Sequence, residues 1–462
     1  MNTKTMYPNY TKLVALTMLL SYALTALAQS TEDKLFNGKD LKGWKIVGGD
    51  ARFDIENGEI VGTAVAGTGN TFLITEKEYG DFVLELEVKI ESPTGNSGVQ
   101  VRSHLDPSGN NGKGKVYGRQ AELDPTARAW SGGIYDEARR DWLYPMSLNA
   151  GAATAYKRES YNHLKIECIG NEMKTWVNGI PAAYVVDTLD TQGFIGLQVH
   201  AISNEKDAGK RVWFRNIKLK TSNLVPTPFP SGIYVVNNIP NFLNAYEEQD
   251  GWKLLFDGKS SAGWLGAYKN AFPSKGWDIS KGTISVLPAA GEESTNGGDI
   301  VTKDQYGAFD LSFEFKLSPG ANSGVKYFVT LSEKNAGSAI GLEYQILDDA
   351  LHPDAKLGRD GNRTLASLYD LIKAEKQQRF VHKIGEWNQG RVVVYPDNRV
   401  EHYLNGVKVL EYVRGSELYR ELVAKSKYKD WKDFGEAAQG HILLQDHGDL
   451  VSFRSIKIKV LR

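Results

Sequence analysis

The chain has 462 residues, a length that corresponds to two or three domains of ordinary size. Its 55 basic and 56 acidic side chains leave a net charge of -1, so no excess of positive charge draws it to nucleic acid or to an anionic membrane. The 41% share of hydrophobic residues is enough for packed cores, and the single cysteine, Cys168, excludes disulfide frameworks and cysteine-based zinc sites. Composition therefore predicts a soluble globular protein.

The first residues have the pattern of a secretory signal peptide. Lys4 and Lys12 precede an apolar run that ends in the small-residue sequence Ala26-Leu27-Ala28. This run is short and interrupted by polar residues, which argues against a membrane span, and no cysteine follows the cleavage site to carry a lipid anchor. We therefore expect residues 1–28 to be removed and the mature chain to be exported, which in a Gram-negative cell means the periplasm.

An internal repeat follows, because blocks from one half of the chain return in the same order in the other half. We predict a tandem duplication, with a first domain over residues 29–221, a linker over residues 222–250 and a second domain over residues 251–462. The linker contains prolines that stiffen its path, together with apolar residues that we expect to pack. The matching blocks are "LFNGKDLKGWKI" with "LFDGKSSAGWLG", "EYGDFVLELEVKIESPTGNSGVQV" with "QYGAFDLSFEFKLSPGANSGVKYF", "WVNGIPAAYV" with "YLNGVKVLEY", "GFIGLQVHA" with "GHILLQDHG", and "VWFRNIKLK" with "VSFRSIKIK".

Each half is rich in strand patterns. Apolar and polar residues alternate through residues 82–90 and again through residues 309–317, the period of a half-buried strand. The tripeptides "VNG" and "LNG" are typical of hairpin turns. One stretch, residues 415–431, has a helical pattern and is predicted to be an insertion in the second half. The sequence thus predicts an all-β protein made of two tandem antiparallel β-sandwiches of the jelly-roll type.

Three strands in each half carry polar side chains at matching positions. The blocks "GRQAELDPT" and "GLEYQILDD" align, the strand after each "NSG" is polar on one face, and so is the penultimate strand. Each of these residues could simply face solvent, but their recurrence in both halves indicates a shared ligand groove. The aligned positions are Gln120 with Glu343, Glu122 with Gln345, Asp124 with Asp348, Gln100 and Arg102 with Lys326 and Phe328, and Gln198 and His200 with Gln445 and His447.

Several ordered motifs resemble one known family. They are "NSGV", "QAELDP", "SGGIYDEARRDWL", "GLEYQILDD", "HPDAKLGRDGNRT", "GEWN", "LNGVKV" and "LQDHG…FRSIKIK". Together they resemble the 3-keto-disaccharide hydrolase domain family, over residues 33–221 and 251–462. The resemblance implies a concanavalin-like jelly roll, export from a Bacteroidetes-type bacterium, and activity on glycosides already oxidised to a ketone at sugar carbon 3.

The chemistry implied by this resemblance is an elimination followed by hydration. A carbonyl at carbon 3 acidifies the hydrogen on carbon 2, so a general base can remove it, the enolate can expel the aglycone from carbon 1, and water can then add. No oxidising cofactor is required if a partner oxidoreductase makes the ketone, and a divalent metal is possible. Stopping before hydration would make the enzyme a lyase.

We assign expected roles to residues on the aligned strands and loops. Amides and amines would donate hydrogen bonds, Tyr135 and Tyr369 could polarise a sugar oxygen, and two tryptophans would either stack on a sugar ring or pack in the core. Candidate substrate-binding residues are Gln345, Lys326, Gln445, Tyr369 and Trp387 in the second half, and Arg102, Gln120, Tyr135, Trp142 and Gln198 in the first. Candidate acid–base residues are Glu343, Asp348, His352, His447, Glu122, Asp124 and His200.

The halves differ, and other functions are conceivable. The first half has no counterpart of His352 and a shorter polar loop, which slightly favours the second half as catalytic and the first as a sugar-binding copy; two active copies are the alternative. A metal could be held by Asp348, Asp349, His352 and Asp354. A non-catalytic carbohydrate-binding protein is the main rival function. A laminarinase-type retaining glycosidase is disfavoured, because Gln345 replaces the first acid of its carboxylate pair.

Overall fold

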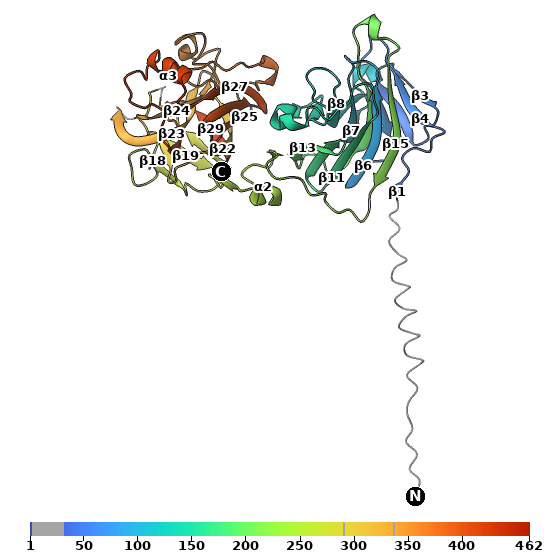
Figure 1. Cartoon of the computed structure of the whole chain (residues 1–462), viewed down its shortest axis with the longest axis horizontal. Coiled ribbons are helices and arrows are strands. Elements are labelled where there is room, and N and C mark those ends of the chain that lie inside the picture. Colours follow the sequence, from blue (N-terminus) through green and yellow to red (C-terminus); the bar gives the residue numbers. More distant parts are fainter. Residues whose placement is uncertain (2–31, 290–291, 336–337) are drawn as a thin grey trace.

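The computed structural model describes Met1 and residues 32–289, 292–335 and 338–462. The predicted signal peptide, residues 1–28, lies outside the described residues apart from Met1. Two β-sandwiches lie side by side, the first coloured blue to green and the second yellow to red (Figure 1). Within the described ranges, no helix is both long and apolar enough to cross a membrane. The all-β prediction with two tandem sandwiches is confirmed.

The first sandwich is built from a larger and a smaller sheet whose pairings are antiparallel except at one edge. The larger sheet runs in the order β16 (Val236–Asn237), β13 (Ile180–Val186), β12 (Glu172–Val177), β11 (Asn162–Ile169), β6 (Phe82–Ile90), β15 (Arg211–Lys220), β4 (Glu59–Thr63) and β3 (Arg52–Glu56), with β1 (Glu32–Asp33) also paired to β15. The smaller sheet runs β10 (Asp141–Tyr144), β9 (Ile134–Glu137), β8 (Lys115–Leu123), β7 (Ser97–Asp106), β14 (Phe194–Val199), β5 (Thr71–Thr75) and β2 (Trp44–Gly48).

The second sandwich repeats this arrangement with fewer strands. Its larger sheet runs β19 (Trp277–Ser280), β20 (Thr283–Val286), β29 (Val451–Val460), β22 (Phe309–Leu317), β25 (Asn388–Val394), β26 (Arg399–Leu404) and β27 (Val407–Val413), with β17 (Trp252–Leu254) paired to β29. Its smaller sheet runs β18 (Trp264–Gly266), β21 (Ile300–Thr302), β28 (His441–Leu444), β23 (Asn322–Asn335) and β24 (Ser338–Leu347).

Helices are few and short in the described part of the chain. The predicted helix over residues 415–431 is α3 (Glu417–Ala424), so only its first half is helical; Ser416 caps it and turns follow. The other α-helix, α2 (Ala245–Gln249), lies between the sandwiches and is capped by Asn244. The remaining helical turns are η1 (Asn110–Gly112), η2 (Met146–Ala152), η3 (Glu205–Asp207), η4 (Pro353–Lys356) and η5 (Gln378–Phe380).

The alternation of strand residues decides which side chains reach the pockets. Successive residues of a strand point to opposite faces, so on β8 Ala121 and Leu123 enter the core between the sheets. Gln120 and Glu122 point to the other face of the smaller sheet, and are nevertheless buried there. Surrounding loops therefore cover this outer face and convert it into a pocket.

The two predicted hairpin turns have the backbone that their sequences require. Asn178 and Gly179 connect β12 to β13, and Asn405 and Gly406 connect β26 to β27. All four have positive φ, which suits the asparagine–glycine turns whose twist matches a right-handed hairpin.

The segment between the sandwiches is packed rather than extended. Tyr234 is 3% exposed, its hydroxyl lies 2.8 Å from Ser312 Oγ of the second sandwich, and its carbonyl accepts a hydrogen bond from the Tyr144 hydroxyl of the first. A buried ion pair joins Glu247 of α2 to Lys457 of β29 at 2.5 Å. The two sandwiches are therefore held against each other through buried contacts.

Candidate functional site

A chain of hydrogen bonds between side chains forms the floor of the first pocket. Strands β7 and β8 pair so that Gln100 stands opposite Gln120 and Gly98 opposite Glu122. Gln100 Nε2 donates to Gln120 Oε1 at 2.9 Å, and Gln120 Nε2 donates to Glu122 Oε2 at 2.9 Å. A Cβ at Gly98 would lie 2.2 Å from Gln120 Cδ, so the glycine makes room for this chain. Each amide thus donates toward the carboxylate.

Glu122 is the buried carboxyl group of this pocket, with 4% of its surface exposed. Its Oε1 accepts hydrogen bonds from Asn96 Nδ2 at 2.6 Å and from the Arg128 guanidinium at 3.2 Å. Burial raises the pKa of Glu122 to about 7, although the hydrogen bonds from Asn96 and Gln120 work in the opposite direction. A carboxyl group with this pKa exchanges a proton near neutral pH, as a general acid or base must.

The walls of the first pocket offer polar atoms that no described residue satisfies. The pocket has a volume of about 230 Å³. Gln198 is 1% exposed, and neither the oxygen nor the nitrogen of its side-chain amide has a hydrogen-bond partner. The indole nitrogen of Trp142 also lacks a partner. An unpaired buried polar group costs about 1–3 kcal/mol, so a ligand that pairs with these atoms would be favoured. His200 lies at the exposed edge, with Nδ1 2.7 Å from the Ala201 carbonyl, which leaves Nε2 as the acceptor.

The second pocket has the same strand positions and different charges. On β23 and β24, Lys326 stands opposite Glu343 and Gly324 opposite Gln345, which matches the alignment of the repeats. Burial raises the pKa of Glu343, partly offset by the positive charges of Lys326 and Lys427. For Lys326, burial lowers the pKa but the charges of Glu343 and its acidic neighbours outweigh it, so the amine stays protonated. Glu343 and Lys326 therefore influence each other's pKa across the two strands, while the ion pair of the Lys326 amine is with Asp299 at 4.0 Å.

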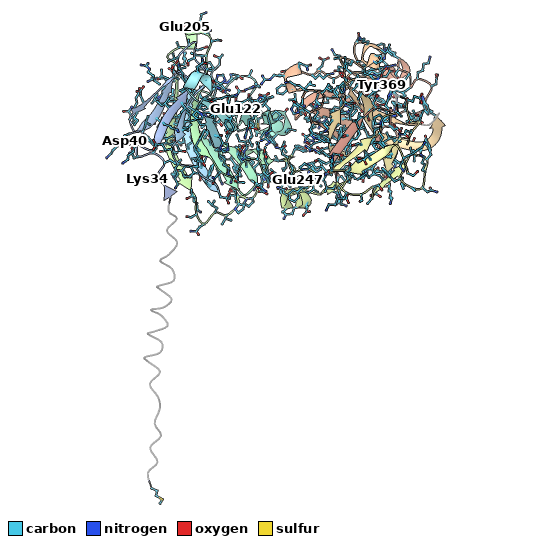
Figure 2. All side chains as sticks on the ribbon, turned by 180° about the vertical axis from the view of Figure 1, so that it is seen from behind. Lys34, Asp40, Glu122, Glu205, Glu247 and Tyr369 are labelled. Carbon is cyan, nitrogen blue, oxygen red and sulfur yellow. The ribbon has the colours of Figure 1, made fainter. Side chains whose placement is uncertain are left out.

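The insertion that begins with α3 closes the second pocket. This pocket of about 250 Å³ is lined on one side by Lys427, Tyr428 and Trp431, which follow α3. The Lys427 amine lies 4.2 Å from the centre of the Tyr369 ring, and burial lowers the pKa of this lysine. Figure 2 labels Tyr369 and, in the other lobe, Glu122 of the first pocket.

Predicted residues that line the pockets come from both halves. In the first pocket they are Gln120, Glu122, Tyr135, Trp142, Gln198 and His200, and in the second they are Lys326, Glu343, Gln345, Tyr369, Gln445 and His447. Like Gln198, Gln445 has a buried amide oxygen without a described partner. The Tyr135 hydroxyl donates to Asp141 at 2.8 Å, and burial together with this carboxylate raises its pKa, so the phenol keeps its proton.

His352 lies beside the second pocket rather than in its lining. Its ring centre is 5.7 Å from that of His447, and with Asp449 the two histidines place three possible ligand atoms within 4.8 Å of one another. Two imidazoles and a carboxylate suit a divalent transition metal. The metal group expected from the sequence is different, because Asp349 pairs with Lys376 and Asp354 with Arg363.

Two aspartates predicted as acid–base residues shape loops instead. Asp348 accepts backbone hydrogen bonds from Gly320, Ala350 and Leu351, and it does not line the second pocket. Asp124 is likewise engaged by Thr126, Arg128 and Trp130, with Arg128 Nε at 2.6 Å. The structure therefore gives both carboxylates a role in their loops, because turns at strand ends use nearby carboxylates to satisfy backbone N–H groups.

Two predicted sugar-binding residues lie elsewhere. Arg102 is 1% exposed and donates to the Gly80 and Gly170 carbonyls and to Asp81, away from the pocket. Strand β7 shifts register between Val101 and His104, and Arg102 has a φ of +47°, so this bulge breaks the alternation on which the prediction depended. Trp387 lies outside the second pocket and lines the groove between the sandwiches.

Several lining residues were missed by sequence reasoning. Asn96 and Asn322 stand in the "NSG" repeats, and their recurrence could have singled them out. Lys427 and Trp431 belong to an insertion, and Arg379 reaches the first pocket from the second sandwich. No pattern in the sequence connects these last residues to the pockets.

Fold and site together define a tandem β-sandwich protein with a pocket on the outer face of each smaller sheet. Each pocket holds a buried carboxyl group and amide side chains, a combination that suits a carbohydrate-active protein. The family model of the 3-keto-alpha-glucoside-1,2-lyase-like domain matches residues 31–220 and 251–459. The chain belongs to this family. Membership confirms the resemblance drawn from the motifs and the prediction that the chain is an enzyme.

The chain is similar to several individual proteins. A 3-keto-disaccharide hydrolase from Bacteroides thetaiotaomicron is 39% identical over 235 residues, which cover 46% of this chain and 80% of that protein. A crystal structure from Parabacteroides distasonis ATCC 8503, described as a "putative glycosyl hydrolase", is 32% identical with a TM-score of 0.42, and covers 48% of this chain and 100% of that one. The carbohydrate-binding module CBM66 from Bacillus subtilis is 19% identical with a TM-score of 0.28, over 38% of this chain and 95% of that one.

Proposed function

We propose that the protein cleaves 3-keto glycosides, including 3-keto disaccharides, by removing the proton from carbon 2, eliminating the aglycone from carbon 1 and adding water. The observation that carries this proposal is Glu122, a buried carboxyl group with a pKa of about 7 that faces unpartnered hydrogen-bond donors. The family and the curated relative, which is named a 3-keto-disaccharide hydrolase, support the substrate class.

In the first pocket, the Glu122 carboxylate takes the proton from carbon 2, and the electron pair of that bond forms an enolate with the carbon 3 carbonyl. The unpartnered N–H groups of Gln198 and Trp142 are the available donors to the enolate oxygen. The enolate then collapses, restores the ketone and expels the carbon 1 oxygen, which leaves with the proton held by Glu122.

Hydration completes the reaction. Water adds its hydroxyl to carbon 1 and a proton returns to carbon 2, which yields the free 3-keto sugar. His200 Nε2, the acceptor of its ring, can take the proton of the attacking water. Because the substrate already holds the ketone, the reaction needs no oxidant.

The second pocket would use Glu343 as its base, with the charged Lys326 beside it as a donor for a developing oxyanion. His352, His447 and Asp449 would hold a divalent cation, which can act as a Lewis acid toward a sugar oxygen. An oxidoreductase acting on the carbon 3 hydroxyl of glycosides is the partner that this chemistry requires. We keep export to the periplasm as part of the proposal.

The rival functions fit the geometry less well. A retaining glycosidase needs two carboxyl groups about 5–5.5 Å apart across the bond that breaks. Asp124 is hydrogen-bonded within its own loop and does not line the pocket, and Glu137, the other carboxyl group in the lining, accepts a hydrogen bond from Asn70. A binding module has no use for a carboxyl group tuned to neutral pH.

The test is to incubate the full chain with a 3-keto disaccharide in deuterium oxide and to locate deuterium in the product. The proposal expects deuterium at carbon 2 and no cleavage of the unoxidised disaccharide. The purified product, incubated without enzyme, corrects for spontaneous exchange next to the ketone. Cleavage without deuterium at carbon 2, or equal cleavage of the unoxidised disaccharide, would overturn it.

A further inference from the structure

The second sandwich contributes to the wall of the first pocket. Arg379, in η5, lines that pocket together with Gln198 and Trp142 of the first sandwich. The neighbouring residue, Phe380, contacts both sandwiches and so fixes the position of Arg379. The Phe380 ring lies 5.8 Å from the Trp130 ring of the first sandwich, and the Phe380 carbonyl accepts a hydrogen bond from Asn405 of the second. The first pocket is therefore complete only in the two-domain chain.

The first pocket also continues into a groove between the sandwiches. Trp142 and Arg379 line both the pocket and this groove, so the two spaces meet at these side chains. The pocket, at about 230 Å³, is smaller than the roughly 300–1,000 Å³ of typical small-molecule sites, whereas the groove has a volume of about 630 Å³. The pocket suits one sugar ring and the groove can hold more.

The groove is also lined by an aromatic ring and polar side chains. Trp387 is half-buried there, with the Arg454 guanidinium 4.1 Å and the Lys316 amine 5.1 Å from its ring centre, and Gln389 of β25 lines the same groove. Arg379 is exposed and has no ion pair among the described residues. An aromatic side chain beside hydrogen-bond donors is the combination that binds a sugar ring, through its apolar face and its hydroxyls.

We propose that this groove is the aglycone site of the first pocket, where Arg379 and Trp387 of the second sandwich bind the second sugar ring of a 3-keto disaccharide. This inference rests on the proposed function and adds to it the part of the chain that selects the leaving group. It assigns the second sandwich a role in the specificity of the first.

The test compares two substrates in a Glu343→Gln background, where the first pocket works alone. We expect Trp387→Ala and Arg379→Ala each to lower kcat/KM for a 3-keto disaccharide about tenfold relative to the methyl 3-keto glucoside, mainly through KM. Such a change corresponds to about 1.4 kcal/mol of binding free energy. Trp213→Ala is the matched control, because Trp213 is also half-buried between a lysine and an arginine but lies outside the pockets. Arg359→Ala controls for an exposed arginine.

An unchanged ratio of the two kcat/KM values in both groove variants would overturn the inference while leaving the proposed function intact. Equal losses on both substrates are one form of this outcome, because they leave the ratio unchanged and mean a general effect on the pocket. If the chain does not turn over either glycoside, the proposed function fails. In that case the dissociation constants of the 3-keto disaccharide and the methyl 3-keto glucoside are measured by calorimetry on the same variants. The ratio of the two dissociation constants then tests the inference in place of the ratio of the two kcat/KM values.

Discussion

The two pockets occupy the same strand positions and place the carboxyl group differently. In the first pocket the carboxyl group is Glu122, near the end of β8, and its neighbours are amides. In the second pocket it is Glu343, which aligns two residues earlier in the strand and stands opposite the amine of Lys326. The three matching positions are Gln100, Gln120 and Glu122 in the first pocket, and Lys326, Glu343 and Gln345 in the second. A duplicated sheet thus kept its geometry while its electrostatics diverged.

The pockets are also closed by different parts of the chain. The second pocket is lined by Lys427 and Trp431 from an insertion in the same sandwich. The first pocket is lined in part by Arg379, which belongs to the second sandwich. One pocket is therefore self-contained and the other depends on the interface. This difference predicts distinct substrates for the two halves.

The largest effect is expected from removal of the two acids in the full chain. Loss of a general base typically costs about 10²–10⁴-fold in rate, so Glu122→Gln and Glu343→Gln should each abolish turnover by one pocket. The double variant should be inactive on every 3-keto glycoside. Glu205→Gln and Glu375→Gln, at exposed sites, are the controls. A fully active double variant would show that neither carboxyl group is the base.

The pH dependence of the first pocket should reveal the role of Glu122. A general base works when deprotonated, so kcat/KM of the Glu343→Gln variant should rise with pH, about tenfold per unit below pH 7, and level off above it. The measurement is a pH–rate profile from pH 5 to 9. A rate that falls through pH 7 would instead identify Glu122 as the acid.

Metal removal should lower the activity of the second pocket and leave that of the first unchanged. Within the described ranges, the three-ligand group of His352, His447 and Asp449 belongs to the second pocket alone. Treatment with EDTA should therefore lower turnover by the Glu122→Gln variant and leave the Glu343→Gln variant unchanged. Atomic emission should find bound metal that His447→Ala releases. Loss of activity in the first pocket on chelation would contradict this division.

The smallest effect is expected for Asp348, which the structure places in a loop. Asp348→Ala removes an acceptor for three backbone N–H groups and should lower the free energy of unfolding by about 1–3 kcal/mol. The turnover of the folded protein should stay close to that of the parent. Thermal unfolding and a rate at 25 °C, with Asp304→Ala as the exposed control, test this. A large loss of turnover at unchanged stability would restore Asp348 to the active site.

Sequence repetition was informative where the strands are regular. On β8 and β24 the period of two correctly grouped Gln120 with Glu122 and Glu343 with Gln345, because an uninterrupted strand fixes the side of every residue. It failed at Arg102, where a bulge reverses the alternation, and at Asp348, where a turn captures the carboxylate. Short-range backbone irregularities leave no reliable trace in such a pattern.

By itself, the sequence determined the duplication, the all-β class, the family and the strand faces that carry the polar residues, since these depend on local periodicity and on the order of motifs. Only the tertiary structure decided which carboxyl groups are buried enough to change their pKa, because burial depends on the loops that fold over the sheet. Only the tertiary structure also brought Arg379 to the first pocket and Trp387 to the adjoining groove, because contacts between the two sandwiches follow no spacing along the chain.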